Sequence, residues 1–129
     1  MRDEQVRRYA RHILLPDVGG LGQTALMVSA ARIELRESEP DAELIAAQYL
    51  AAGGVGTIVL AGASPDQVAP VAARGGDSQI TTEGTGRDLG LQPRPAWWPP
   101  CDAREATTAL AFWRGGLAAT RWMADVANQ

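Results

Sequence analysis

Thr57-Ile58-Val59-Leu60-Ala61 is short and almost wholly apolar, and it is the stretch around which the fold of this chain can be inferred. A run of this kind is expected of a strand whose two faces are both buried, as in the middle of a parallel sheet. Gly53 and Gly54 stand just before it and would end a preceding helix. Ser64 and Gln67 follow it in the spacing of a capping box, which begins a new helix. The run is therefore predicted to be a buried strand between two helices.

The residues upstream predict another strand and the helix that connects it to the first. From Ala31 to Ser38 apolar and polar residues alternate, with Ile33 and Leu35 on the apolar face, which indicates a strand with one face in water. Such a strand is expected at a sheet edge or where the sheet is thinly covered. Ser38 is expected to cap a helix over residues 39–52.

Downstream, the helix that begins at Ser64 is expected to run to Arg74, and residues 79–82 are expected to form a third strand. The order strand, helix, strand, helix, strand is typical of right-handed βαβ units on a parallel sheet. Residues 84–101 are rich in Gly, Pro and Trp and are predicted to be a loop, and residues 102–127 are predicted to be one long helix. The fold class is therefore α/β: a shortened Rossmann-like parallel sheet with flanking helices and a long C-terminal helix, in a single domain over residues 1–129.

The N-terminal residues predict an arm and a further helix. Residues 3–12 are charged and are expected to form a short exposed helix or arm. A turn is expected at Gly19-Gly20-Leu21-Gly22, between this arm and a helix-compatible pattern over residues 23–31.

Composition and charge exclude several functions. The formal net charge is -3 and no basic patch is visible, so no nucleic-acid partner is expected. No apolar run is long enough to span a bilayer, and no secretory signal is visible at Met1, so a cytoplasmic location without membrane contact is expected. The chain has one cysteine, Cys101, and one histidine, His12, too few for a disulfide or a zinc site. All basic residues are arginines, which excludes Schiff-base chemistry at a lysine.

Residues 8–23 read RYARHILLPDVGGLGQ, an unusual mixture of Arg, Pro and Gly. This stretch closely resembles the N-terminal signature of the ThiF/MoeB/HesA family. Members of that family are bacterial E1-like enzymes that adenylate the C-terminus of a ubiquitin-fold sulfur-carrier protein. Residues 48–58, QYLAAGGVGTI, look like the family's first crossover helix entering its second strand. The resemblance covers residues 1–60 well and the remainder loosely, and full family domains are nearly twice this length.

The sequence departs from the family at the nucleotide site. The family's first strand enters a glycine-rich turn whose backbone N–H groups approach phosphate. Here residues 35–41 contain no glycine, and Glu37, Glu39 and Asp41 stand where a polyphosphate would bind. The family's acidic run after the second strand, its active-site lysine and its CxxC zinc motifs are also absent. The ATP-binding loop is therefore expected to be lost, with no catalytic residues, cofactor or metal.

The resemblance then implies a non-catalytic E1-like domain, a pseudoenzyme that acts as a dimeric binding or regulatory partner. The expected partner is a second copy or an intact E1-like paralogue, with a ubiquitin-like or sulfur-carrier protein as a further candidate. In the family, an arginine of the first signature reaches the ATP site of the partner subunit. Arg11 matches that arginine and Arg8 precedes it, so both are candidates for nucleotide binding in trans, while a simple ion pair is the alternative.

The candidate interface residues come from the arm and from the long helix: Tyr9, His12, Phe112, Trp113, Gly116 and Trp122. The helix carries more large apolar surface than a small sheet needs, which leaves both core packing and burial against another subunit open. Glycine costs stability within a helix, so the pair Gly115-Gly116 predicts that some other part of the protein approaches the helix backbone closely there.

Two further functions stay open at this point. A minimal adenylyltransferase using ATP and Mg²⁺ would need replacement phosphate ligands, for which Arg32, Arg36 and Arg74 are the candidates. A small-molecule binding module would use the loop of Trp97 and Trp98 and the sheet edge. These two rings are more simply explained as a plug over an apolar surface.

Overall fold

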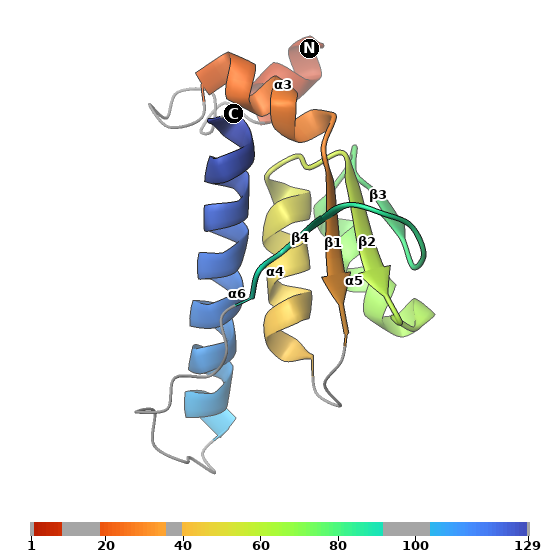
Figure 1. The fold of residues 1–129 in the computed structure, drawn as a ribbon, viewed down its shortest axis with the longest axis vertical. Coiled ribbons are helices and arrows are strands. Elements are labelled where there is room, and N and C mark those ends of the chain that lie inside the picture. Colours follow the sequence, from red (N-terminus) through yellow and green to blue (C-terminus); the bar gives the residue numbers. More distant parts are fainter. Residues whose placement is uncertain (1, 9–18, 36–39, 92–103, 129) are drawn as a thin grey trace.

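A computed structural model describes residues 2–8, 19–35, 40–91 and 104–128 of the chain. Its four strands, β1 (Ala30–Glu34), β2 (Thr57–Ala61), β3 (Gln79–Thr81) and β4 (Arg87–Asp88), form one sheet in the order β3-β2-β1-β4 (Figure 1). Every neighbouring pair of strands is parallel. The predicted α/β class with a parallel sheet is confirmed.

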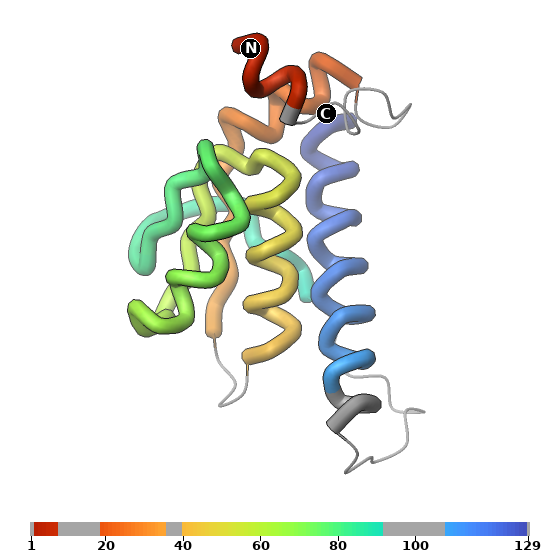
Figure 2. The backbone as a smooth tube through the Cα atoms, turned by 180° about the vertical axis from the view of Figure 1, so that it is seen from behind, coloured from red at the N-terminus to blue at the C-terminus, as the bar shows by residue number. Residues whose placement is uncertain are grey.

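The helices of the described residues are α1 (Asp3–Arg8), α3 (Gly19–Met27), α4 (Asp41–Ala52), α5 (Pro65–Arg74) and α6 (Arg104–Ala127). Helix α4 connects β1 to β2, and α5 connects β2 to β3. Seen from behind, α4 and α5 stand in front of the strands and α6 runs beside α4 (Figure 2). One face of the sheet is therefore covered by a helical layer in which α4 is flanked by α5 and α6.

The core lies between the sheet and this layer. Ile58 and Leu60 of β2 are fully buried, as are Leu50 of α4 and Leu26 of α3. Burying a side chain of this size contributes about 1.5–3 kcal/mol relative to leaving it exposed. The apolar run at residues 57–61 is thus the central part of the core, as its composition predicts.

The opposite face of the sheet carries polar side chains and one buried apolar residue. Arg32 pairs with Glu34 at 2.7 Å between Nη1 and Oε1, and both side chains are partly exposed. Val59 is buried on β2, and a Cβ placed on Gly84 would lie 3.4 Å from its Cγ2 atom. The connection between β3 and β4 therefore covers this face, and Figure 1 shows it crossing β2 and β1. Strand β1 is an inner strand of the sheet and not an edge strand. Of the two explanations given for its half-exposed face, thin cover of the sheet is therefore the correct one.

Two predicted helix boundaries are wrong. Helix α3 begins at Gly19, so the glycines expected to form a turn lie in its first part, and it ends at Met27. Ala30 and Ala31 pair with β2 instead of continuing the helix, because Thr57 and Ile58 supply their strand partners. Helix α4 has Pro40 as its N-cap, without a side-chain cap hydrogen bond. The predicted cap Ser38 lies outside the described residues.

The predicted start of α5 is confirmed. The predicted loop over residues 84–101 contains a strand, β4, that the sequence did not predict. The Ser64 side chain accepts from the Gln67 backbone N–H, and the Gln67 side chain accepts from the Ser64 N–H, which completes the capping box. Strand β4 is a two-residue pairing with β1. Its two residues are too few to show an apolar periodicity, so the sequence could not predict it. Contacts with other elements hold this strand: Leu89 is buried, and the Trp122 indole donates to the Arg87 carbonyl at 3.1 Å.

Helices α4 and α6 approach each other closely at Gly115. A Cβ on Gly115 would overlap the carbonyl oxygen of Ala42 and lie 3.1 Å from the backbone nitrogen of Ala46. A Cβ on Gly116 would instead make an ordinary contact with the Tyr49 ring at 3.7 Å. The close backbone approach predicted for the glycine pair is confirmed at Gly115.

No helix in the described ranges has the length and apolar character needed to cross a bilayer.

Candidate functional site

Open α/β sheets bind ligands at the carboxyl ends of their parallel strands. In this chain the described residues at that end follow β1 and β2 and begin α4 and α5. The two connections, from β1 to α4 and from β2 to α5, are therefore the candidate ligand-binding loops.

The connection from β1 to α4 places acid at the helix N-terminus. Asp41 is exposed and Glu43 is almost fully buried, and both lie in the first turn of α4. Glu43 shares the helix face of Ala46, Ala47 and Leu50, which are buried in the core. The first-turn N–H groups would normally attract an anion. Here the exposed Asp41 carboxylate occupies the same turn, where it would repel a phosphate.

The connection from β2 to α5 is closed by its own capping box. Ser64 Oγ receives the Gln67 N–H at 3.3 Å, and Gln67 Oε1 receives the Ser64 N–H at 2.9 Å. Two of the donors that a bound anion would need are therefore already used within the chain. Asp66 is the acidic residue of this turn and is exposed.

The described residues offer neither a metal centre nor a converging set of arginines. No group of three or more His, Cys, Asp or Glu side chains with metal-binding geometry occurs within them. Arg32 pairs with Glu34 on the sheet face away from the helices, whereas Arg74 ends α5 and lines a groove of the helical layer. Since these two arginines lie on different faces, they do not form the replacement phosphate site. Arg36 and Cys101 lie outside the described residues.

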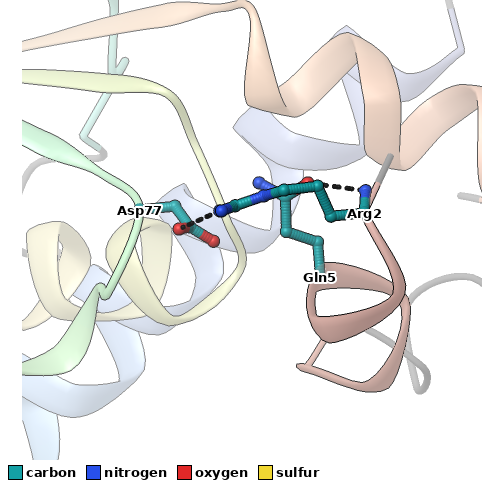
Figure 3. A network of polar contacts seen from close by, with 3 residues as sticks. All are labelled: Arg2, Gln5 and Asp77. Carbon is teal, nitrogen blue, oxygen red and sulfur yellow. Dashed lines mark hydrogen bonds and ion pairs between the residues drawn. The ribbon is translucent and has the colours of Figure 1, made fainter.

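Helix α1 lies at the other end of the molecule, beside the C-terminal end of α6 (Figures 1 and 2). The Arg2 guanidinium pairs with Asp77 at 3.3 Å, and the Arg2 backbone N–H donates to Gln5 at 3.0 Å (Figure 3). Asp77 comes just before β3, so this contact ties α1 to the amino ends of the strands. Arg8 is the last residue of α1. Helix α1 therefore lies far from the carboxyl ends of the strands in the same chain.

The predicted interface residues separate into an exposed and a buried group. Phe112 is 52% exposed and Trp113 is 45% exposed on α6, and Gly116 lies beside the Tyr49 ring. Trp122 is only 3% exposed and packs in the core. Trp122 is therefore a core residue whose ring is not exposed to a partner. Tyr9, Arg11 and His12 lie outside the described residues, as do Trp97 and Trp98.

A groove of about 340 Å³ opens on the outer side of the helical layer. Its lining residues come from three helices: Ile45, Gln48, Tyr49, Ala52, Arg74 and Phe112. Phe112 is one of the predicted interface residues, but its place beside α4 was not predicted. The available signal was the placement of Ile45 and Tyr49 four residues apart, beside the buried stripe of that helix.

A second apolar surface was not predicted. Leu21 is 92% exposed on α3, and Val28 follows it by seven residues and is also largely exposed. Val28 lies in the turn just after α3, which ends at Met27. Leu21 also belongs to the signature at residues 8–23.

No protein-family model matches the chain, and no curated protein matches it either.

Proposed function

We propose that the chain is a non-catalytic E1-like domain of the ThiF/MoeB/HesA type, which has lost ATP binding and acts as a binding or regulatory partner. The observation that carries this proposal is the β1–α4 connection. Asp41 and Glu43 occupy the turn that would receive phosphate, and Pro40 is the N-cap.

The electrostatic cost supports the loss of nucleotide binding. A triphosphate at this turn would lie close to the exposed Asp41 carboxylate. Two unit charges about 4 Å apart interact by about 1 kcal/mol in bulk water and by about 4 kcal/mol at the effective dielectric constant of a protein surface. Repulsion in that range is comparable to or larger than the attraction of a helix N-terminus, which is worth about 0.3–2 kcal/mol. Glu43 is buried, so its side chain cannot swing into water without disturbing the core.

The chain is expected not to bind ATP with Mg²⁺. Isothermal titration of the isolated protein should give only heats of dilution up to about 1 mM nucleotide, a limit that corresponds to about -4 kcal/mol of binding free energy. An intact E1-like enzyme in the same buffer is the positive control. Micromolar binding by this chain, or ATP–pyrophosphate exchange in the presence of a carrier protein, would overturn the proposal.

The partner role is proposed from exposed apolar side chains. Leu21 on α3 and Val28 in the turn after it are exposed, and Phe112 and Trp113 are half-exposed on α6. Exposed apolar surface that gathers in patches is typical of contact sites between proteins. The proposed assembly is a homodimer or a heterodimer with an intact E1-like paralogue, to whose ATP site Arg8 and Arg11 would be supplied. A ubiquitin-like or sulfur-carrier protein would be a third component.

Leu21→Glu is expected to weaken this assembly without unfolding the chain, because the side chain is 92% exposed. Sedimentation velocity should show a dimer of the unaltered chain, alone or mixed with the paralogue, and a shift toward monomer for the variant. Ala73→Glu adds the same charge at another exposed helical position and is the matched control. If the unaltered chain stays monomeric both alone and in the mixture, the partner role is wrong.

A further inference from the structure

The groove on the helical layer combines an apolar wall with three polar side chains. Ile45, Ala52 and Phe112 supply the wall. Phe112 and Tyr49 remain 52% and 46% exposed, so a large part of their rings is left in water. Burial of apolar surface of this kind is the main favourable term when a ligand enters a groove.

The polar side chains of the groove are donors that the described residues leave unused. Gln48, Tyr49 and Arg74 carry an amide, a hydroxyl and a guanidinium, and no side-chain hydrogen bond or ion pair of these three occurs within the described ranges. Arg74 also ends α5, where a positive charge favours the helix C-terminus. That role uses its charge but not its donor groups. The carboxylate of Asp77, next along the chain, already pairs with Arg2.

We propose that this groove binds a small apolar carboxylate. Its ring or aliphatic body would lie against Ile45 and Phe112, and its carboxylate would pair with Arg74 beside the Tyr49 hydroxyl. Charge complementarity selects the anion, because Arg74 is the charged residue among the described residues that line the groove. A guanidinium can give a carboxylate two parallel hydrogen bonds, which fixes the orientation of the ligand.

The size of the groove favours a small ligand over a protein surface. A volume of about 340 Å³ lies at the lower end of the range for small-molecule sites. A stable protein interface buries about 800 Å² on each partner, which is much more than six lining residues offer. This inference goes beyond the proposed function, since it needs neither a nucleotide nor a partner subunit.

The probe is 3-phenylpropanoate, titrated into the full chain and followed by the backbone amide resonances in ¹H–¹⁵N NMR spectra. Saturable shifts are expected at Gln48, Tyr49, Ala52 and Phe112, with a Kd of about 1 mM for a ligand of so few atoms. The neutral analogue 3-phenylpropanamide is expected to bind about tenfold more weakly, because it cannot form the charge-assisted pair.

Arg74→Gln should weaken the carboxylate about tenfold and leave the amide unchanged. Arg121→Gln is the matched control, since it removes an exposed arginine from α6 outside the groove. The spectrum of each variant reports directly whether it is folded.

Three results would overturn the proposal. The first is the absence of shifts up to about 10 mM probe, or shifts at residues elsewhere in the chain. The second is equal binding of carboxylate and amide by the unaltered protein. The third is the same set of shifts on raising the protein concentration without probe, because a second copy of the chain would then be the occupant.

Discussion

Trp122→Ala is expected to lower the free energy of unfolding by about 3–5 kcal/mol, the usual cost of truncating a large buried aromatic side chain. The Trp122 ring is 3% exposed and lies in the core between α6 and the sheet. Its indole N–H also donates to the Arg87 carbonyl at 3.1 Å, so the variant leaves a buried cavity and removes the side-chain bond between α6 and β4. A domain of this size has a total stability of about 5–15 kcal/mol, and a large share of it would be lost.

Chemical denaturation followed by circular dichroism measures this loss. Trp122→Phe keeps most of the ring and is expected to cost about 1–3 kcal/mol, largely for the carbonyl left without its donor. Trp113→Ala is the matched control on the same helix and should cost less than about 1 kcal/mol, because Trp113 is 45% exposed. Equal effects of Trp113→Ala and Trp122→Ala would show that Trp122 is not a core residue.

The indole bond matters more than the ion pair between the same elements. Arg87 and Asp125 approach to 3.9 Å, but their side chains are 45% and 67% exposed. Exposed pairs of this kind contribute little, since water screens the attraction and two long side chains must be ordered. The attachment of β4 to α6 therefore depends chiefly on Trp122.

Much of the fold could be predicted where local sequence and tertiary structure agree. The apolar run at residues 57–61 is β2 with unchanged bounds, and Ser64 and Gln67 form the capping box that their spacing predicts. Both signals are strong because each depends on a few adjacent residues. The end of α3 could not be predicted in this way. Ala30 suits a helix, and its pairing with Thr57 of β2 places it in the strand, whereas Ala31 is also the first residue of the predicted strand.

The candidate sites were less accessible to sequence reasoning. Of the three carboxylates that the sequence placed after the first strand, Asp41 lies in the first turn of α4, whereas Glu37 and Glu39 lie outside the described residues. The buried Glu43 was not predicted. The groove could not be predicted, since it combines α4 with single residues of α5 and α6, and no sequence spacing relates Tyr49 to Arg74 or Phe112. The exposure of Trp113 and the burial of Trp122 likewise follow from how α6 is rotated against α4, which periodicity fixes only approximately.

Gly115→Ala is expected to destabilise the chain by about 2 kcal/mol or more, although alanine is the better helix former by about 1 kcal/mol. The added Cβ would overlap the Ala42 carbonyl oxygen and crowd the Ala46 nitrogen, at 3.1 Å, and the side chain of Ile45, at 3.2 Å. Two of these contacts are backbone atoms of α4, which cannot rotate away as a flexible side chain would. The two helices must therefore move apart, and the apolar contacts along their length weaken together.

Gly116→Ala separates this steric effect from helix propensity. The neighbouring position has the same propensity gain, but its Cβ meets only the Tyr49 ring at 3.7 Å, so this variant should gain up to about 1 kcal/mol of stability. Urea midpoints of the two variants should therefore shift in opposite directions from that of the unaltered chain. If both variants were stabilised, α6 would not approach the α4 backbone at Gly115. The close packing would then be wrong, and with it the groove, whose walls α4 and α6 both form.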